Sequence, residues 1–229
     1  MKRGLIITID GPAGAGKSTV SKALARKLSY VYLDTGALYR AIAYKILDEG
    51  ISPDNEKLLS GLCDRMNIHL KNIGGSLNVF IDGENITDKI RTEEVGLLAS
   101  TVSAMPIVRD ALLSIQREAG AKGGIVAEGR DMGTVVFPEA DCKFYLDAGM
   151  KERVKRRYKE LITRGNAPDY QKIKSDLIFR DKQDQGREIA PLKVSHDAVI
   201  IDSTSVSISD VVEKMLQIIR SYQGFSSTK

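Results

Sequence analysis

A glycine-rich segment that ends in lysine and serine lies near the start of the chain. Residues 11–18 read Gly-Pro-Ala-Gly-Ala-Gly-Lys-Ser and directly follow the apolar run at 5–10. They match the pattern G-x-x-x-x-G-K-[ST] between a predicted strand and a predicted helix. The glycines let the backbone fold around a phosphate chain with its N–H groups pointing inward. This segment therefore restricts the chain to an α/β fold that binds a nucleoside triphosphate.

The last residues of this segment have distinct chemical roles. Lys17 can reach the outer phosphates, and the Ser18 hydroxyl is the predicted ligand of Mg²⁺. The helix predicted over residues 17–28 presents its partially positive N-terminus to the same phosphates. We expect the triphosphate to contact Gly11, Pro12, Ala13, Gly14, Ala15, Gly16, Lys17, Ser18 and Thr19.

Strand-like apolar runs alternate with helix-length amphipathic segments along the chain. Continuous apolar runs such as 125–127 and 199–201 are typical of strands covered on both faces. We predict an α/β fold in three layers, a parallel sheet of about five strands flanked by helices. The strands are expected at residues 5–10, 30–33, 124–128, 142–146 and 198–201. The helices are expected at residues 17–28, 38–49, 55–66, 92–103, 107–120, 151–164, 169–185 and 207–222.

One stretch, residues 67–90, interrupts this alternation. Residues 77–81 alternate with period two, and Asp82-Gly83 is a strong turn signal. We predict a small antiparallel β insert there, at about 64–92, which overhangs the carboxyl edge of the sheet where α/β proteins bind ligands. The whole of 1–223 is expected to be a single domain, with a helical lid at about 151–168 and a flexible tail at 224–229.

Composition limits the partners of the chain. The formal net charge of +4 at pH 7 suits anionic small substrates, but it is too small for a nucleic-acid binder. Aromatic residues make up 6% with no tryptophan, so no stacking platform for single strands is expected. No apolar stretch approaches the length of a membrane span. The two cysteines, Cys63 and Cys142, lie far apart in the sequence and are predicted to be buried thiols of a reducing compartment. We expect a cytoplasmic protein with no nucleic-acid or membrane partner.

Two polar segments follow predicted strands. Thr35 and Arg40 come after the second strand, where they can face the ligand-binding edge. In the alternative, Asp34 or Thr35 only caps the next helix and Arg40 lies on its solvated face. Glu128 closes the third core strand, where an acidic residue can hold Mg²⁺ through water or accept a hydrogen bond from a substrate. Arg130 suits a phosphate, whereas the alternative is an internal ion pair with Asp131.

Two basic clusters follow toward the C-terminus. Residues 151–164 hold seven lysines and arginines, among them Arg153 and Arg157, one helical turn apart. This run is either a solvated helix face or a mobile lid that closes arginines over the transferring phosphoryl group. Arg180, Asp184 and Arg187 are spaced by four and three, so a helix would place them on one face. They form either a structural ion-pair group or a clamp for ribose and phosphate.

The chain resembles the bacterial cytidylate kinases from end to end. The resemblance is carried by residues 9–18, 33–40, 90–95, 128–138, 190–192 and 201–204, together with Arg180-Asp181 leading to Asp184 and Arg187. The loop at 11–18 alone occurs in many nucleotide-binding proteins, but its combination with 34–40 and 128–138 is highly specific. The predicted insert is similar to the extra subdomain of this family, which would bind the nucleoside monophosphate.

The resemblance implies transfer of the γ-phosphate of ATP to CMP or dCMP with Mg²⁺ as cofactor. It implies that the acceptor phosphate is held by Thr35, Arg40, Arg130 and Arg187, and the sugar by Arg180 and Asp184. Cytosine would be read by Ser100, Arg109 and Asp131, since its amino group needs a carboxylate and its ring acceptors need a donor. The catalytic groups would be Lys17, Arg130, Arg187, Arg153 and Arg157.

Two alternatives share the phosphate-binding loop. A kinase acting on a hydroxyl metabolite would not need Arg109 and Asp131 beside a base. A nucleotide-dependent switch or RNA-binding ATPase would use the loop for conformational control, and the short basic helix and scarce aromatics disfavour it. We expect a monomeric enzyme whose partners are ATP and CMP or dCMP.

Overall fold

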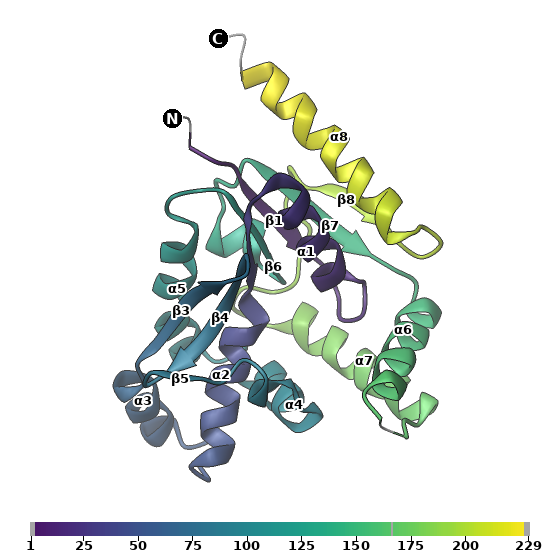
Figure 1. The fold of residues 1–229 in the computed structure, drawn as a ribbon. Coiled ribbons are helices and arrows are strands. Elements are labelled where there is room, and N and C mark those ends of the chain that lie inside the picture. The colour runs from purple at the N-terminus through teal and green to yellow at the C-terminus, as the bar shows by residue number, and fades with distance from the viewer. Residues whose placement is uncertain (1–2, 166, 227–229) are drawn as a thin grey trace.

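The chain folds into one twisted sheet with helices on both faces, shown in Figure 1 as a computed structural model that describes residues 3–165 and 167–226. The strands are β1 (Ile6–Asp10), β2 (Val31–Asp34), β3 (Ile68–Ile73), β4 (Ser76–Ile81), β5 (Glu84–Asn85), β6 (Ile125–Gly129), β7 (Cys142–Asp147) and β8 (Val199–Asp202). Within the described residues their order is β3-β4-β2-β6-β1-β7-β8, with β5 paired to β4. The neighbours from β2 to β8 pair in parallel. The predicted parallel core of five strands is confirmed.

The helices connect these strands. They are α1 (Lys17–Leu28), α2 (Thr35–Asp48), α3 (Glu56–Arg65), α4 (Glu93–Val102), α5 (Pro106–Gly120), α6 (Met150–Thr163), α7 (Tyr170–Gly186) and α8 (Ile208–Ser226), with a 3₁₀ turn η1 (Lys89–Arg91) and a π turn η2 (Met132–Val136). α2 begins at Thr35 rather than at residue 38, because the Asp34 side chain accepts a hydrogen bond from Ala37 N. α8 continues to Ser226, into the segment predicted as a tail, and residues 227–229 of that prediction lie outside the described residues.

The alternation of side chains along β1 divides the core into two layers. Ile7 and Ile9 pack in the cluster formed with α1 and α8, whereas Ile6 packs on the other face with Val136. Successive strand residues point to opposite faces, so Asp10 shares the face of Ile6. The same rule on β6 places Glu128 on the α1 side. Asp10 and Glu128 therefore both lie at the carboxyl edge of the sheet, and their side chains point to opposite faces.

The predicted insert is a hairpin that extends the edge of the main sheet. β3 and β4 are antiparallel, with Ile68 opposite Ile81, and β4 joins β2 through one parallel pair, Tyr32 and Ser76. This register carries residues 79–81 past Asp34, the last residue of β2. The hairpin thus projects beyond the carboxyl edge of the parallel strands, as Figure 1 shows.

No single helix in the described ranges is long and apolar enough to cross a membrane. α4 and α5 pass that test only as a pair, bent by 101° at the break between them. Both contribute side chains to the largest buried cluster of the domain, which also includes α2 and α3.

Candidate active site

The loop between β1 and α1 encloses the Lys17 ammonium group. Gly11, Gly14 and Gly16 have φ angles of 147°, 77° and 93°, which L residues rarely adopt. A Cβ at Gly11 would lie 2.0 Å from the Leu146 carbonyl oxygen, so the loop packs directly against β7. Lys17 Nζ donates to the carbonyl oxygens of Gly11 and Pro12, each at 2.8 Å. Burial, followed by the nearby Arg130, lowers the pKa of Lys17.

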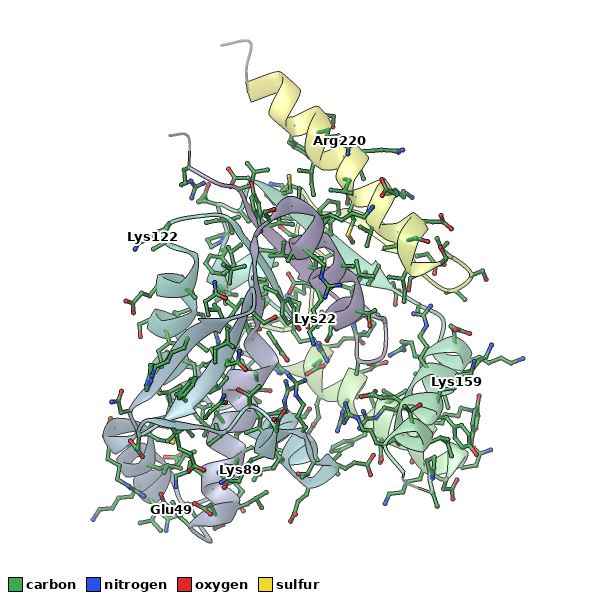
Figure 2. All side chains as sticks on the ribbon, in the orientation of Figure 1. Lys22, Glu49, Lys89, Lys122, Lys159 and Arg220 are labelled. Carbon is green, nitrogen blue, oxygen red and sulfur yellow. The ribbon has the colours of Figure 1, made fainter. Side chains whose placement is uncertain are left out.

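Two cavities meet at this loop. The central cleft, of about 310 Å³, is lined by the carboxyl ends of β2 and β6 and by α4 and α7. The side cleft, of about 580 Å³, runs along α1 and α6 toward the start of α8. Lys17, Ser18 and Arg157 line both. Figure 2 shows nitrogen-tipped side chains gathered in the region framed by α1, α4, α6 and α7. Two bound molecules, one in each cavity, would therefore meet at Lys17.

Most of the predicted site residues lie around these cavities. The central cleft is lined by Ala13, Gly14, Lys17, Ser18, Thr35, Arg40, Ser100, Arg130, Asp131, Arg157, Arg180, Asp184 and Arg187. The side cleft adds Ala15, Gly16 and Thr19. Gly11, Pro12, Arg109 and Arg153 are absent from both sets of described lining residues.

Asp184 joins two arginines at the floor of the central cleft. Arg130 Nε donates to Asp184 Oδ2 at 2.6 Å, and Arg187 Nη2 donates to Oδ1. Burial alone would raise the pKa of Asp184, but Arg130 and Arg187 outweigh it and lower the pKa. Of the predicted group, Asp184 therefore pairs with Arg187 but not with Arg180, whose Nε is buried with no partner among the described residues, and Arg130 supplies the second arginine. The paired guanidinium groups keep further N–H donors for an anion.

The start of α2 forms a second wall of the central cleft. Arg40 Nη2 donates to Asp34 Oδ2 at 2.7 Å, and Arg91 Nη1 lies 3.7 Å from the same oxygen. Burial would raise the pKa of Asp34, yet Arg40 and Arg91 overcome it and lower the pKa. Thr35 Oγ1 donates to the Glu128 carbonyl oxygen at 2.7 Å. Asp34 thus caps α2 and orients Arg40 at the same time, which combines the two interpretations considered for this segment.

The inner end of the central cleft is polar and closely packed. Asp131, which is 2% exposed, accepts a hydrogen bond from Arg109 Nη2. Burial raises the pKa of Asp131 despite this partner. Ser100 Oγ donates to Gln183 Oε1 at 3.1 Å, so α4 and α7 are connected beside the cleft. The predicted base-reading residues are therefore brought together, with the guanidinium of Arg109 behind the carboxylate of Asp131.

Glu128 points to the α1 face of the sheet, where its carboxylate interacts with the Ser18 hydroxyl. It also accepts a hydrogen bond from Tyr32 OH. Burial, and then the Asp34 carboxylate, raises the pKa of Glu128. Within the described residues no cluster of three or more His, Cys, Asp or Glu could hold a metal ion by itself. A hydroxyl and one carboxylate are oxygen donors that fit Mg²⁺ when phosphate oxygens supply the remaining ligands.

The basic helix α6 separates its cations between two faces. Lys151, Lys155 and Lys159 are exposed, and Figure 2 shows Lys159 on the outer side of the helix. Arg157 turns toward both cavities. Arg153 is 7% exposed, donates to the Ala13 carbonyl oxygen at 3.1 Å and pairs with Asp181 at 2.7 Å. The helix therefore combines the solvated face and the inward arginines that the sequence left as alternatives.

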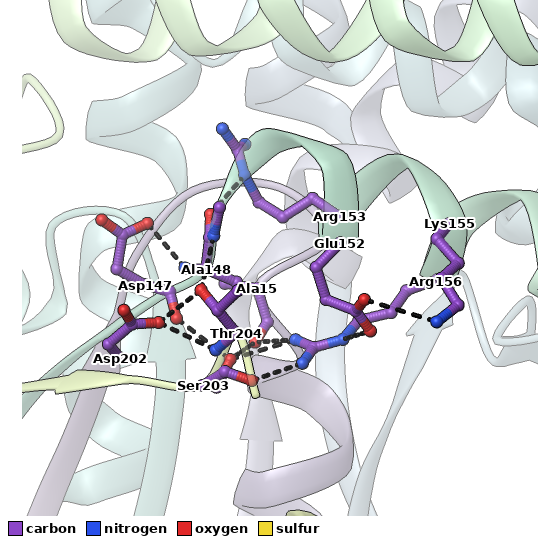
Figure 3. A network of polar contacts seen from close by, with 11 residues as sticks. Ala15, Asp147, Ala148, Glu152, Arg153, Lys155, Arg156, Asp202, Ser203 and Thr204 are labelled. Atoms are coloured by element: carbon purple, nitrogen blue, oxygen red, sulfur yellow. Dashed lines mark hydrogen bonds and ion pairs between the residues drawn. The ribbon is translucent and has the colours of Figure 1, made fainter. Parts of the chain in front are cut away.

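A third arginine of α6 fastens the phosphate-binding loop. Figure 3 shows Arg156 bound to the Ala15 carbonyl oxygen, to Ser203 Oγ and to the Ser203 carbonyl oxygen, at 3.1, 3.0 and 2.6 Å. Ser203 Oγ also lies 3.0 Å from the carbonyl oxygens of Ala15 and Asp147. The loop after β8 is thus connected to the phosphate-binding loop through one buried hydroxyl.

The sequence assigns no role to Tyr39, which lines the central cleft, or to Arg91, Gln183 and Arg156. Tyr39 occupies a helical position that also fits a core residue, and Arg91 belongs to the segment 90–95, in which no single residue stands out. Gln183 and Arg156 carry no spacing signal of their own. Their positions depend on contacts between elements far apart in the chain, such as α6 and β8 or α4 and α7.

Comparison with known proteins shows which family the chain is similar to. The cytidylate kinase family model matches residues 7–221. A cytidylate kinase of Citrifermentans bemidjiense is 50% identical over 214 residues, which cover 93% of this chain and 92% of the relative. One of Geobacter sulfurreducens is 48% identical and covers 96% of this chain and 94% of the relative. A gluconokinase structure from Sinorhizobium meliloti shares the fold, with a TM-score of 0.51 at 14% identity, over 100% of this chain and 99% of that one.

Proposed function

Since the chain belongs to the cytidylate kinase family, we propose that the central cleft holds the acceptor nucleotide and the side cleft holds ATP. The enzyme is a nucleoside monophosphate kinase that phosphorylates CMP. The proposal extends this activity to dCMP and assigns residues to it. The observation that carries it is the meeting of the two cavities at Lys17, because direct phosphoryl transfer requires donor and acceptor to be adjacent.

The acceptor phosphate would be held by the arginines of the central cleft. Arg130 and Arg187 are oriented by Asp184, and Arg40 is oriented by Asp34. Each guanidinium keeps N–H donors that its ion pair does not use, so a phosphate can bind without breaking these pairs. Thr35 stands at the same edge, and Arg180, with a buried unpartnered Nε, would contact the sugar together with Asp184.

The base would lie at the inner end of the cleft, against Ser100 and Asp131, with Arg109 behind the carboxylate. The Asp131 carboxylate accepts from the cytosine amino group, whereas uracil offers a carbonyl there and leaves the carboxylate unpaired. Arg109 holds the carboxylate in place from behind. These contacts would select cytosine over uracil.

Phosphoryl transfer requires little covalent chemistry from the chain. Lys17 and the converging arginines Arg130, Arg187 and Arg157 would stabilise charge on the transferring group, with Arg153 fastening α6 to the loop. Ser18 would bind Mg²⁺ and Glu128 would hold one of its waters. When bound, Mg²⁺ neutralises the phosphate oxygens of ATP. We place the enzyme in the cytoplasm as a monomer, a setting that suits its two free thiols, Cys63 and Cys142.

A coupled assay of ATP consumption tests the proposal. The acceptors are CMP, dCMP, UMP, AMP and shikimate, each over a range of concentrations. We expect kcat/KM to be highest with CMP and dCMP and shikimate to be inert. Equal values with CMP and UMP would contradict the assigned base contacts, and turnover without acceptor equal to that with CMP would contradict transfer between the two cavities.

A further inference from the structure

The turn that follows Arg130 and Asp131 is capped from a neighbouring strand. η2 begins at Met132, and its first two backbone N–H groups have no partner within such a short turn. Met132 N donates to Asp10 Oδ1 at 2.9 Å, and Gly133 N donates to Asp10 Oδ2 at 2.8 Å. Both oxygens of one buried carboxylate, 4% exposed, are therefore used to cap this turn.

Asp131 occupies the position whose side chain usually provides such a cap. An aspartate at the N-cap commonly accepts a hydrogen bond from the second or third N–H of the turn. Among the described contacts, the Asp131 side chain makes no such bond. Its carboxylate instead meets Arg109 and lines the central cleft. The only atom of Asp131 that bonds its own turn in the described structure is its carbonyl oxygen, which accepts from Val135 N and Val136 N.

The alternation along β1 explains how Asp10 reaches this turn. Asp10 points to the face of the sheet on which η2 packs, two residues beyond Thr8 on the same face. A Cβ at Gly133 would lie 3.4 Å from Asp10 Oδ2 and 3.1 Å from Thr8 Oγ1. A side chain at residue 133 would require these neighbours to shift by a few tenths of an ångström, so glycine suits this close approach of the turn to β1.

We propose that Asp10 is a positioning residue that caps η2 in place of Asp131 and thereby keeps the Asp131 carboxylate free for the base of the acceptor nucleotide. Asp10 lines neither cavity among the described residues, so it acts through Asp131 and not by contact with substrate. Asp10 also directly precedes the phosphate-binding loop. Its contact with η2 therefore links the position of this loop to the position of the base site. The functional part of this inference rests on the base contacts assigned above.

A double-mutant cycle tests the coupling. The four proteins are the wild type, Asp10→Asn, Asp131→Asn and the double variant, assayed for KM with CMP, UMP and ATP. Asparagine at position 10 keeps one oxygen acceptor, but its amide N–H then faces a backbone N–H of η2. One of the two capping hydrogen bonds is therefore lost. We expect Asp10→Asn to raise KM for CMP about tenfold and to leave KM for ATP within about twofold. In the Asp131→Asn background the same change should have little further effect on KM for CMP. Equal factors in both backgrounds, or an equal rise in KM for ATP, would overturn the proposal.

A structural measurement separates this inference from the assigned base contacts. In a crystal structure of Asp10→Asn, we expect the Asp131 carboxylate to turn back and accept from Gly133 N or Thr134 N. An Asp131 that stays paired with Arg109 would overturn the positioning role. Asp131→Asn with unchanged KM for CMP would instead contradict the base contacts, and the crystal structure would still decide the role of Asp10. Asp10→Ser, which keeps one hydroxyl acceptor, replaces Asp10→Asn if the latter does not fold.

A matched control removes a cap far from the cleft. Asn55 caps α3 by accepting from Leu58 N at 3.1 Å. Asn55→Ala should lower Tm and leave the ratio of kcat/KM for CMP and UMP unchanged. A change in that ratio would show that loss of any cap alters selectivity, and it would remove the support for a specific role of Asp10.

Discussion

Arg109 and Asp131 form a buried ion pair at the inner end of the central cleft, with side chains 7% and 3% exposed. Arg109 Nη1 also donates to the Ser103 carbonyl oxygen at 3.1 Å, and its guanidinium lies 5.7 Å from the centre of the Tyr39 ring. Three contacts therefore hold the guanidinium, and the guanidinium in turn holds the carboxylate. A carboxylate fixed in this way is a rigid acceptor for an amino group, which is what discrimination between cytosine and uracil requires.

Asp131→Asn should reduce that discrimination. The amide keeps the size of the side chain but presents an N–H toward the base, which suits the carbonyl of uracil. We expect KM for CMP to rise about tenfold and the preference for CMP over UMP to narrow, because one good base contact is worth about 1–3 kcal/mol. Steady-state kinetics with both acceptors measures this. An unchanged preference would remove Asp131 from the base site.

Asp184→Asn should impair the phosphate-binding arginines. Without the carboxylate charge, Arg130 and Arg187 repel each other and lose their common anchor. We expect kcat/KM for CMP to fall about a hundredfold while KM for ATP changes little. Glu213→Gln, which breaks the exposed pair with Lys27, is the control and should leave both constants unchanged. A similar loss in the two variants would contradict the role of Asp184.

Arg157→Ala should reduce catalysis more than stability, whereas Arg153→Ala should reduce stability more than catalysis. Arg157 lines both cavities, so its loss should lower kcat about a hundredfold with little effect on Tm. Arg153 is buried against the Ala13 carbonyl and Asp181, so its loss should lower the free energy of unfolding by about 3 kcal/mol. Kinetics and thermal unfolding of both proteins measure the contrast. Equal kcat values in the two variants would contradict the assignment of Arg157 to the cleft.

Ser18→Ala should weaken the use of Mg²⁺. The hydroxyl is the predicted ligand, and Glu128 beside it is proposed to hold a coordinated water. We expect the Mg²⁺ concentration for half-maximal activity to rise about tenfold, with KM for CMP unchanged. Titration of activity with Mg²⁺ at constant ATP measures this. Chelation of the metal should abolish transfer in both proteins, and activity that persists without Mg²⁺ would contradict the metal assignment.

The stability of the protein should report the titration of Asp10. Burial is the main cause that raises its pKa to about 6, against hydrogen bonds from Gly133 and Met132 that lower it. Because the folded state then binds a proton that the unfolded state has already released, Asp10 loses stabilising effect as pH rises from about 4 to about 7. Relative to Asp10→Asn, the wild type should lose about 3 kcal/mol over this range, from a rise of about two pKa units. Denaturant unfolding at several pH values measures the difference, and parallel curves would contradict it.

Local patterns determined much of the fold. The phosphate-binding loop, the parallel strands around it and the amphipathic helices follow from glycine positions and from periods of two and 3.6, which depend only on neighbours in the chain. Helix starts were less predictable. Residue 38 was the expected start of α2, but the Asp34 side chain begins the helix at Thr35, which places Arg40 further into it. The hairpin at residues 68–81 was expected from its alternation, whereas its attachment to β2 through Tyr32 and Ser76 depends on the register between distant strands.

By itself, the sequence determined that this chain binds a triphosphate and that arginines accompany it, since those conclusions need only a contiguous motif and a count of charges. Tertiary structure decided which charges face the ligand. Arg153 and Arg157 differ by one helical turn, yet Asp181 and the Ala13 carbonyl bury the first and leave the second in the cleft. Likewise, Asp10 caps the turn η2, which begins 122 residues later in the chain, so the Asp131 side chain is not needed as its cap. A buried polar group requires a partner, and only the packing of distant elements determines which partner it finds.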